Sequence, residues 1–293
     1  MTRRWTAAAT APTAATAALG LVLSCAGTEG PLLRVHDGGP ADGATAPDAG
    51  SARDDRVRPG MQLHYQIVGT VGTVGTVGTP EVAADADVVV LDLFETERAE
   101  LTALRGAGHT LVAYLSAGSY EPWRPDAARF PDASLGEPLA NYPSERWLDV
   151  RSTQVREIMR ARLALARDKG FDGVFPAALG GQLVDSGFAL DDAAQLSYDR
   201  WLATTARELG LTPGLADFGL ASQLADVFDW AIVAGCLAAD SCSRVEPLLT
   251  RGKAVFSLET SADTTSVCTR AAELGISAVF KRPSYEVWSR PCP

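Results

Sequence analysis

The sequence is poor in the residue types on which several kinds of chemistry depend. It has three histidines and five cysteines in 293 residues, with no Cys-x-x-Cys motif and no Gly-x-Ser-x-Gly motif. Without clustered histidines and cysteines there is no ligand set typical of zinc. Without the Gly-x-Ser-x-Gly turn there is no serine site of the α/β-hydrolase kind. We therefore expect no metal and no cofactor.

Positive charge is also scarce. The chain has 26 Lys and Arg against 36 Asp and Glu, which gives a formal net charge of −10 at pH 7. No basic stripe with interleaved aromatic residues occurs, and such a stripe is the usual footprint of a nucleic-acid-binding surface. We expect no nucleic acid among the partners, and the acidic surface by itself identifies no other partner.

The N-terminal segment is typical of an export signal rather than of a folded element. Arg3 and Arg4 precede an apolar run of small residues that Pro12 interrupts, so the run is unsuited to a membrane-spanning helix. It ends in LVLSC, which resembles the bacterial lipoprotein cleavage box. We expect residues 1–24 to be a lipoprotein signal peptide and Cys25 to carry a lipid that anchors the exported protein to a bacterial membrane or cell surface. Ordinary signal cleavage just after this run is the alternative.

The next segment lacks the pattern of a folded domain. Residues 25–60 are rich in Gly, Ala, Asp and Pro and show no hydrophobic periodicity, which predicts a disordered tether. Residues 61–293 carry the periodic hydrophobic runs and form the predicted domain.

Four cysteines remain in this domain when Cys25 is lipidated. An even number of cysteines in an exported chain favours disulfides. Of the three possible pairings we expect Cys236–Cys242 and Cys268–Cys292, because each closes a local loop.

Short apolar runs alternate with longer amphipathic runs throughout the domain. Strands are expected at 63–68, 88–93, 110–115, 173–175, 211–215, 230–233, 254–258 and 276–280. The clearest helices are expected at 96–107, 153–169, 191–209 and 263–274, and a glycine follows several of them. Eight β–α units in about 230 residues predict an α/β protein with a single (β/α)₈ TIM barrel. A doubly wound open sheet is the alternative, but no Gly-x-Gly-x-x-Gly follows the first strand.

Barrel enzymes carry their catalytic groups at the C-terminal ends of the strands. In this sequence those positions are polar after the second, third, seventh and eighth strands, and apolar or small after the fourth and sixth. The residues expected to contact a ligand are Asp92, Tyr114, Ser116, Tyr120, Glu259 and Lys281. Trp123 and Trp147 are expected to pack as anchors beneath the long loop after the third strand.

Several stretches carry a resemblance to a known family. They are 87–95 (DVVVLDLFE), 115–126 (LSAGSYEPWRPD), 146–150 (RWLDV), 170–174 (GFDGV) and the Cys236 and Cys242 pair. They resemble the endo-α-1,4-polygalactosaminidases, the family 114 glycoside hydrolases, over nearly the whole domain. The resemblance implies a (β/α)₈ barrel that acts on galactosamine-containing polysaccharide, with catalytic acids after the fourth and sixth strands.

At both acid positions the sequence departs from the family pattern. Where the family reads Glu-Pro-Asp-Asn, residues 175–178 read Phe-Pro-Ala-Ala, so the first acid falls on Ala177. Where the family reads Asn-Glu-Gln-Cys, residues 233–236 read Val-Ala-Gly-Cys, so the second falls on Ala234. The resemblance therefore implies a glycan-binding pseudoenzyme. The alternatives are an active glycosidase with relocated acids, Asp92 and Glu259, and a barrel with a structural or protein-interaction role.

Overall fold

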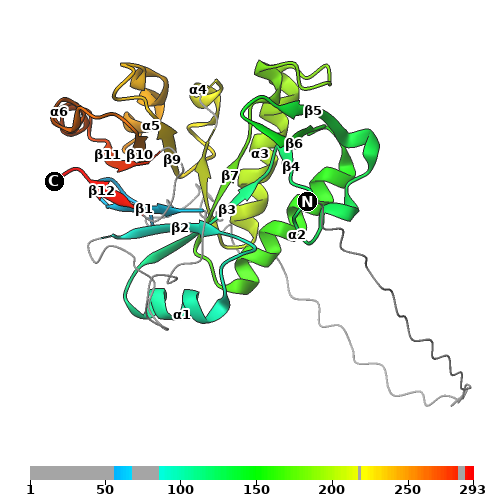
Figure 1. Cartoon of the computed structure of the whole chain (residues 1–293), viewed down its shortest axis with the longest axis horizontal. Helices are drawn as coiled ribbons and strands as arrows, with labels where there is room; N and C mark the ends of the chain where they lie inside the picture. Colours follow the sequence, from blue (N-terminus) through cyan, green and yellow to red (C-terminus); the bar gives the residue numbers. More distant parts are fainter. Residues whose placement is uncertain (1–55, 68–85, 217–218, 283–287) are drawn as a thin grey trace, which may run out of the picture. The chain divides into compact units, whose positions relative to one another are not determined.

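A computed structural model describes residues 56–67, 86–216, 219–282 and 288–293 (Figure 1). The expected signal peptide, Cys25 and most of the expected tether lie outside these residues. Val57 belongs to the stretch expected to be tether, yet it is 3% exposed and packs in the core with Leu63 and Val88. The packed core thus extends upstream of residue 61.

Eight parallel strands follow one another in chain order around a nearly closed barrel (Figure 1). They are β1 (Leu63–Gln66), β2 (Val88–Asp92), β3 (Thr110–Ser116), β7 (Gly173–Ala177), β8 (Thr212–Leu215), β9 (Trp230–Ala234), β10 (Ala254–Glu259) and β11 (Ser277–Lys281). Each corresponds to an expected strand, which confirms the predicted TIM-like barrel. A ninth strand that the sequence did not indicate, β12 (Ser289–Pro291), pairs antiparallel with β11.

The strands are apolar on both faces because the barrel interior covers one face and the helices cover the other. All five residues of β2 are buried. Val88 and Val90 pack with Trp230 in the cluster that fills the barrel. Val89 and Leu91 alternate with them and pack in the separate cluster beneath the helices.

Local sequence signals set the ends of the helices, which are α1 (Arg98–Gly106), α2 (Thr153–Lys169), α3 (Asp192–Glu208), α4 (Ala221–Leu224), α5 (Glu246–Leu249) and α6 (Thr264–Leu274). The side chain of Ser152 accepts a hydrogen bond at the start of α2, and Gly170 ends that helix at a φ of 102°. Asp263 and Gly275 do the same for α6. No helix in the described ranges is both long and apolar enough to cross a membrane.

Between β3 and β7, where the sequence predicts a long loop, the chain leaves the barrel and forms a small antiparallel sheet. We call residues 117–150 the excursion. Its strands are β4 (Ser119–Tyr120), β5 (Leu135–Leu139) and β6 (Tyr142–Leu148), in the order β4-β6-β5. Short 3-10 turns lie at Ala127–Arg129 and Asp132–Ser134 here, and elsewhere at Gly181–Leu183 and Cys242–Val245. In Figure 1 this sheet is drawn on the α2 and α3 side of the barrel, away from α6.

Both expected disulfides are present. Cys236 and Cys242 are joined across six residues with their Cα atoms 4.9 Å apart, and Cys268 and Cys292 are joined across 24 residues with Cα atoms 5.5 Å apart. The second disulfide ties α6 to the end of the chain beyond β12. The pairing predicted from local loop closure is confirmed.

Candidate functional site: an acidic cavity at the strand ends

A cavity of about 810 Å³ lies at the C-terminal ends of the barrel strands, where the fold class predicts a site. Its volume falls in the usual range for small-ligand sites, roughly 300–1,000 Å³. Tyr65 and Phe175 form part of its buried floor, with ring centroids 6.3 Å apart. The barrel core thus continues directly into the cavity.

The chemistry of the cavity lining is one-sided. Among the described residues, every charged side chain in the lining comes from the end of β2 or from the excursion: Asp92, Glu95, Glu121, Arg124 and Glu145. The ends of β7, β8, β9 and β10 contribute apolar groups: Phe175, Ala177, Ala178, Ala216, Ile232, Val233, Ala234 and Leu258. One side of the cavity can therefore attract a cation, whereas the described side chains on the other side offer methyl, methylene and ring surface.

A glycine allows the excursion to start close to the apolar side. Gly118 follows β3, and a Cβ atom at this position would overlap the backbone carbonyl of Ala178. The N–H groups of Ala117 and Gly118 donate to the carbonyl of Ala177 at 2.9 and 3.3 Å. The end of β3 and the first residues after β7 are therefore held in direct contact, which brings the excursion to the cavity.

Arg124 holds two of the lining acids. Its Nη1 and Nη2 donate to the two oxygens of Asp92 at 2.9 and 2.6 Å. Its Nε and Nη2 donate to the two oxygens of Glu121 at 2.8 and 2.9 Å. All three side chains are at least nine-tenths buried. Burial disfavours the charge on Arg124, but the hydrogen bonds to Glu121 and Asp92 outweigh that effect and raise its pKa.

This arrangement places Asp92 and Glu121 close together without leaving either available. Because both accept from Nη2 of Arg124, at 2.6 and 2.9 Å, their nearest oxygens lie closer together than the roughly 6.5–9.5 Å that inverting glycosidases need. However, every oxygen of the pair already accepts from Arg124, and Asp92 Oδ1 also accepts the N–H groups of Phe94 and Glu95 at 2.8 and 3.0 Å. A ligand would have to compete with a buried ion pair.

Glu145 and Glu95 are the lining acids that remain accessible to a ligand. Oε2 of Glu145 accepts from Ser119 Oγ at 2.6 Å, and its other oxygen has no hydrogen bond within the described residues. Burial raises the pKa of Glu145, and the hydrogen bond from Ser119 opposes this rise. The side chain of Glu95 is 68% exposed, 3.7 Å from Arg124. In the described ranges, no group of three or more His, Cys, Asp or Glu is placed to hold a metal ion.

The structure brings together only part of the residue set expected from the sequence. Asp92 and Tyr114 line the cavity, as do Ala177 and Ala234. The other four expected ligand contacts are not among the lining residues: Ser116, Tyr120, Glu259 and Lys281.

Two of these side chains are buried, and a third packs against a ring of the excursion. Ser116 and Lys281 are 1% and 2% exposed. The ring of Tyr120 packs edge-on against Phe130, with centroids 5.6 Å apart.

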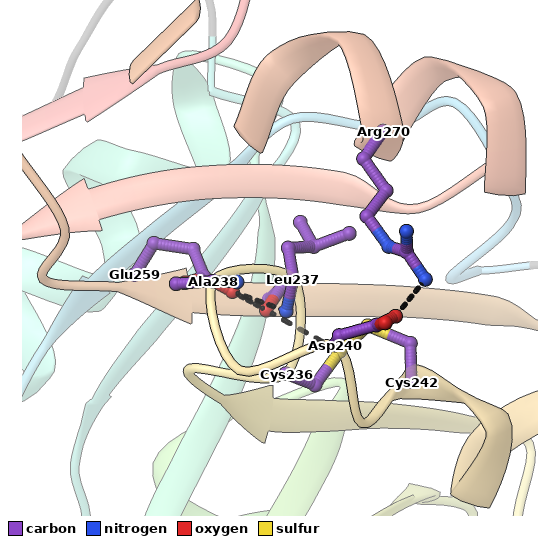
Figure 2. Close-up of a disulfide and its surroundings, with 8 residues drawn as sticks. Cys236, Leu237, Ala238, Asp240, Cys242, Glu259 and Arg270 are labelled. Carbon is purple, nitrogen blue, oxygen red and sulfur yellow. Dashed lines mark hydrogen bonds and ion pairs between the residues drawn. A yellow bond between two sulfur atoms is a disulfide. The ribbon is translucent and has the colours of Figure 1, made fainter. Parts of the chain in front are cut away.

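Glu259 is directed away from the cavity. It is fully buried and accepts from the N–H groups of Leu237 and Ala238 at 3.0 and 3.4 Å and from Ser257 Oγ at 2.6 Å. Figure 2 shows its side chain directed at the loop that the Cys236–Cys242 disulfide closes. Glu259 therefore fixes the loop that follows β9, and it does not meet Asp92 across the cavity as the relocated-acid alternative requires.

The sequence reasoning missed two features of the lining. Glu145 lies in β6, and only the pairing of β6 with β4 brings it next to Ser119. Trp123 was expected to be a packing anchor, but it is 53% exposed and lines the cavity. Trp147, by contrast, is half-buried and lies against Gly181. The sequence carries little signal for this pairing, because β4 is only two residues long.

One protein family matches most of this chain. The model of glycoside-hydrolase family GH114 matches residues 45–293. The crystal structure of Aspergillus fumigatus Ega3 in complex with galactosamine is similar with a TM-score of 0.73 and 29% identity, covering 81% of this chain and 97% of that one. The glycoside hydrolase domain of PelA from Pseudomonas aeruginosa shares the fold, with a TM-score of 0.60 and 16% identity over 79% of this chain and 98% of that one. No curated protein sequence matches.

Proposed function

Because the chain belongs to glycoside-hydrolase family GH114, we propose that it binds a galactosamine-containing polysaccharide without cleaving it. The observation that carries this proposal is the one-sided lining of the cavity. Its acids lie at β2 and the excursion, and alanines occupy the positions that the family resemblance assigns to the catalytic acids.

The chemistry of glycoside cleavage supports the absence of turnover. Hydrolysis needs one carboxylic acid to protonate the leaving oxygen and a second carboxylate to act as nucleophile or base. The methyl groups of Ala177 and Ala234 can do neither. Asp92 and Glu121 lie close together, but both are bound to Arg124. Losing groups of this kind typically lowers rates by about 10²–10⁴ each.

The charge of the lining supports an amino sugar as ligand. Four carboxylates face one guanidinium among the described lining residues, so the cavity attracts cations. Ega3 is known in complex with galactosamine, whose amine is protonated at neutral pH. Glu145 and Glu95 have the accessible oxygens to pair with such an amine, and Tyr65 and Tyr114 offer ring surface to the sugar.

We also propose that the protein acts outside the cytoplasm on a lipid anchor at Cys25. Two disulfides in the domain suit an oxidising compartment. The expected outcome is that Cys25→Ser moves the protein from the membrane fraction to the medium. Mass spectrometry that finds an unmodified N-terminus beyond residue 25 contradicts the anchor.

A hydrolase that uses Glu145 is the competing function. A raised pKa in a lining carboxyl is the property that a general acid needs. Its partner would be Glu95, which is mostly exposed and near Arg124. This pair replaces the pair expected from the sequence, Asp92 and Glu259.

The test combines binding and hydrolysis on the purified full chain. The probe is partly deacetylated galactosaminogalactan, with its fully N-acetylated form as the matched control. We expect saturable binding of the deacetylated form by calorimetry and no new reducing ends. Turnover that disappears in Glu145→Gln would establish the hydrolase instead. Absence of binding to either polymer would contradict the proposal and favour the alternative, a barrel with a structural or protein-interaction role.

A further inference from the structure

The cavity lining contains two aromatic side chains that folding leaves mostly in water. Trp123 is 53% exposed and Tyr142 is 57% exposed. Deeper in the same cavity, Tyr65 and Phe175 are each 5% exposed. The cavity therefore runs from a buried aromatic floor to an exposed aromatic rim, which we define as Trp123 and Tyr142.

The outward position of Trp123 follows from its neighbours in the chain. Glu121 and Arg124 are buried and paired with each other at 2.8 Å. The N–H of Arg124 also donates to the carbonyl of Glu121 at 3.2 Å, which closes a tight turn. Because both flanking side chains point inward, Pro122 and Trp123 are held outward. A buried ion-pair network thus presents a large apolar ring to solvent, and such exposure in a cavity marks a contact surface rather than a packing anchor.

Tyr142 is presented by a second rigid element. It is the first residue of β6 and pairs with Leu139 of β5 at the tip of a hairpin. Glu145 lies three residues farther along the same strand and also lines the cavity. Glu95, 3.7 Å from Arg124, also offers an exposed carboxylate. Two accessible acids in the same lining therefore accompany the two aromatic side chains of the rim.

We propose that Trp123 and Tyr142 stack the sugar rings of a cationic hexosamine chain where it leaves the cavity, so that the protein selects oligomers over monosaccharides. This inference rests on the proposed polysaccharide-binding function. The C–H face of a pyranose packs on aromatic rings, and a protonated amine is attracted both to ring faces and to carboxylates. A single sugar can be held at the floor without Trp123 or Tyr142, whereas a chain that extends outward meets the rim.

The experiment compares two ligands on matched variants of the full chain. Galactosamine and an α-1,4-linked galactosamine octamer are titrated calorimetrically into wild type, Trp123→Ala and Tyr142→Ala. Trp288→Ala is the control, because Trp288 is also an exposed tryptophan (40%) but is not among the lining residues. Circular dichroism verifies that each variant is folded.

We expect the octamer to bind wild type more tightly than galactosamine does. Each rim substitution should weaken octamer binding about tenfold and leave galactosamine binding within about twofold, whereas the control changes neither. Equal octamer affinities in wild type and both rim variants would refute the proposed stacking on Trp123 and Tyr142 and leave the proposed function in place. Wild type that binds galactosamine as tightly as the octamer would do the same. Wild type that binds neither ligand would overturn the proposed function together with the rim.

Discussion

Replacing Arg124 with methionine is the most informative single change in this protein. The guanidinium makes four hydrogen bonds to Asp92 and Glu121, and the three side chains are 4–6% exposed. Methionine keeps much of the apolar stem but removes the charge. Two carboxylates then remain buried at close range without a counter-ion.

The size of the effect follows from this burial. Removing one partner of a buried ion pair typically costs about 3–5 kcal/mol, because the remaining charge is neither paired nor hydrated. We expect Arg124→Met to lose stability in this range. Arg151 is a matched comparison, because its Nε and Nη2 bind Asp149 in the same two-pronged way at 2.9 and 3.0 Å while its side chain is 48% exposed. Arg151→Met should cost under about 1 kcal/mol.

The assay is equilibrium unfolding in urea with the disulfides intact, followed by far-ultraviolet circular dichroism and by tryptophan fluorescence. The triple variant Asp92→Asn, Glu121→Gln, Arg124→Met removes the stranded charges and should be more stable than the single variant. The reasoning is refuted if Arg124→Met and Arg151→Met lose the same amount. It is also refuted if neutralising the two acids restores nothing.

Three further predictions address stability, titration and catalysis. The double variant Cys268→Ser, Cys292→Ser should lose about 3 kcal/mol in urea unfolding, since the disulfide closes a 24-residue separation. Glu145→Gln should be more stable than wild type at neutral pH. A raised folded-state pKa means that wild type loses stability as pH rises from the ordinary carboxyl range through that pKa, so melting temperatures of the two proteins should converge in acid. Ala177→Asp with Ala234→Glu should release no reducing ends, because the adjacent lining is apolar, and turnover would contradict this.

The Arg124 network also explains why neighbouring residues of one motif differ in burial. Within the stretch Glu121 to Arg124, the two charged ends are buried and the tryptophan between them is exposed. A reading of residue types alone gives the reverse expectation, with charges in water and the aromatic ring packed. The inversion arises because Asp92, 32 residues earlier in the chain, supplies the second acceptor for Arg124.

The barrel, its helix ends and both disulfides could be predicted from the sequence. These features depend on interactions between residues that are close together in the sequence. Apolar runs alternate with amphipathic ones, Ser152 and Gly170 delimit α2 through contacts within one turn, and each cysteine pair closes a local loop. The position of the cavity at the strand ends followed from the fold class alone.

Only the tertiary structure decided which side chains face that cavity. Glu145 reaches it because β6 pairs with the two-residue strand β4, a partner with almost no sequence signal. Glu259 was expected there because it ends a strand, but the N–H groups of Leu237 and Ala238 bind it on the far side of the cavity wall. The end of a strand determines the position of the backbone only. The direction of a buried charged side chain is determined by the hydrogen-bond donors around it, and these come from distant parts of the chain.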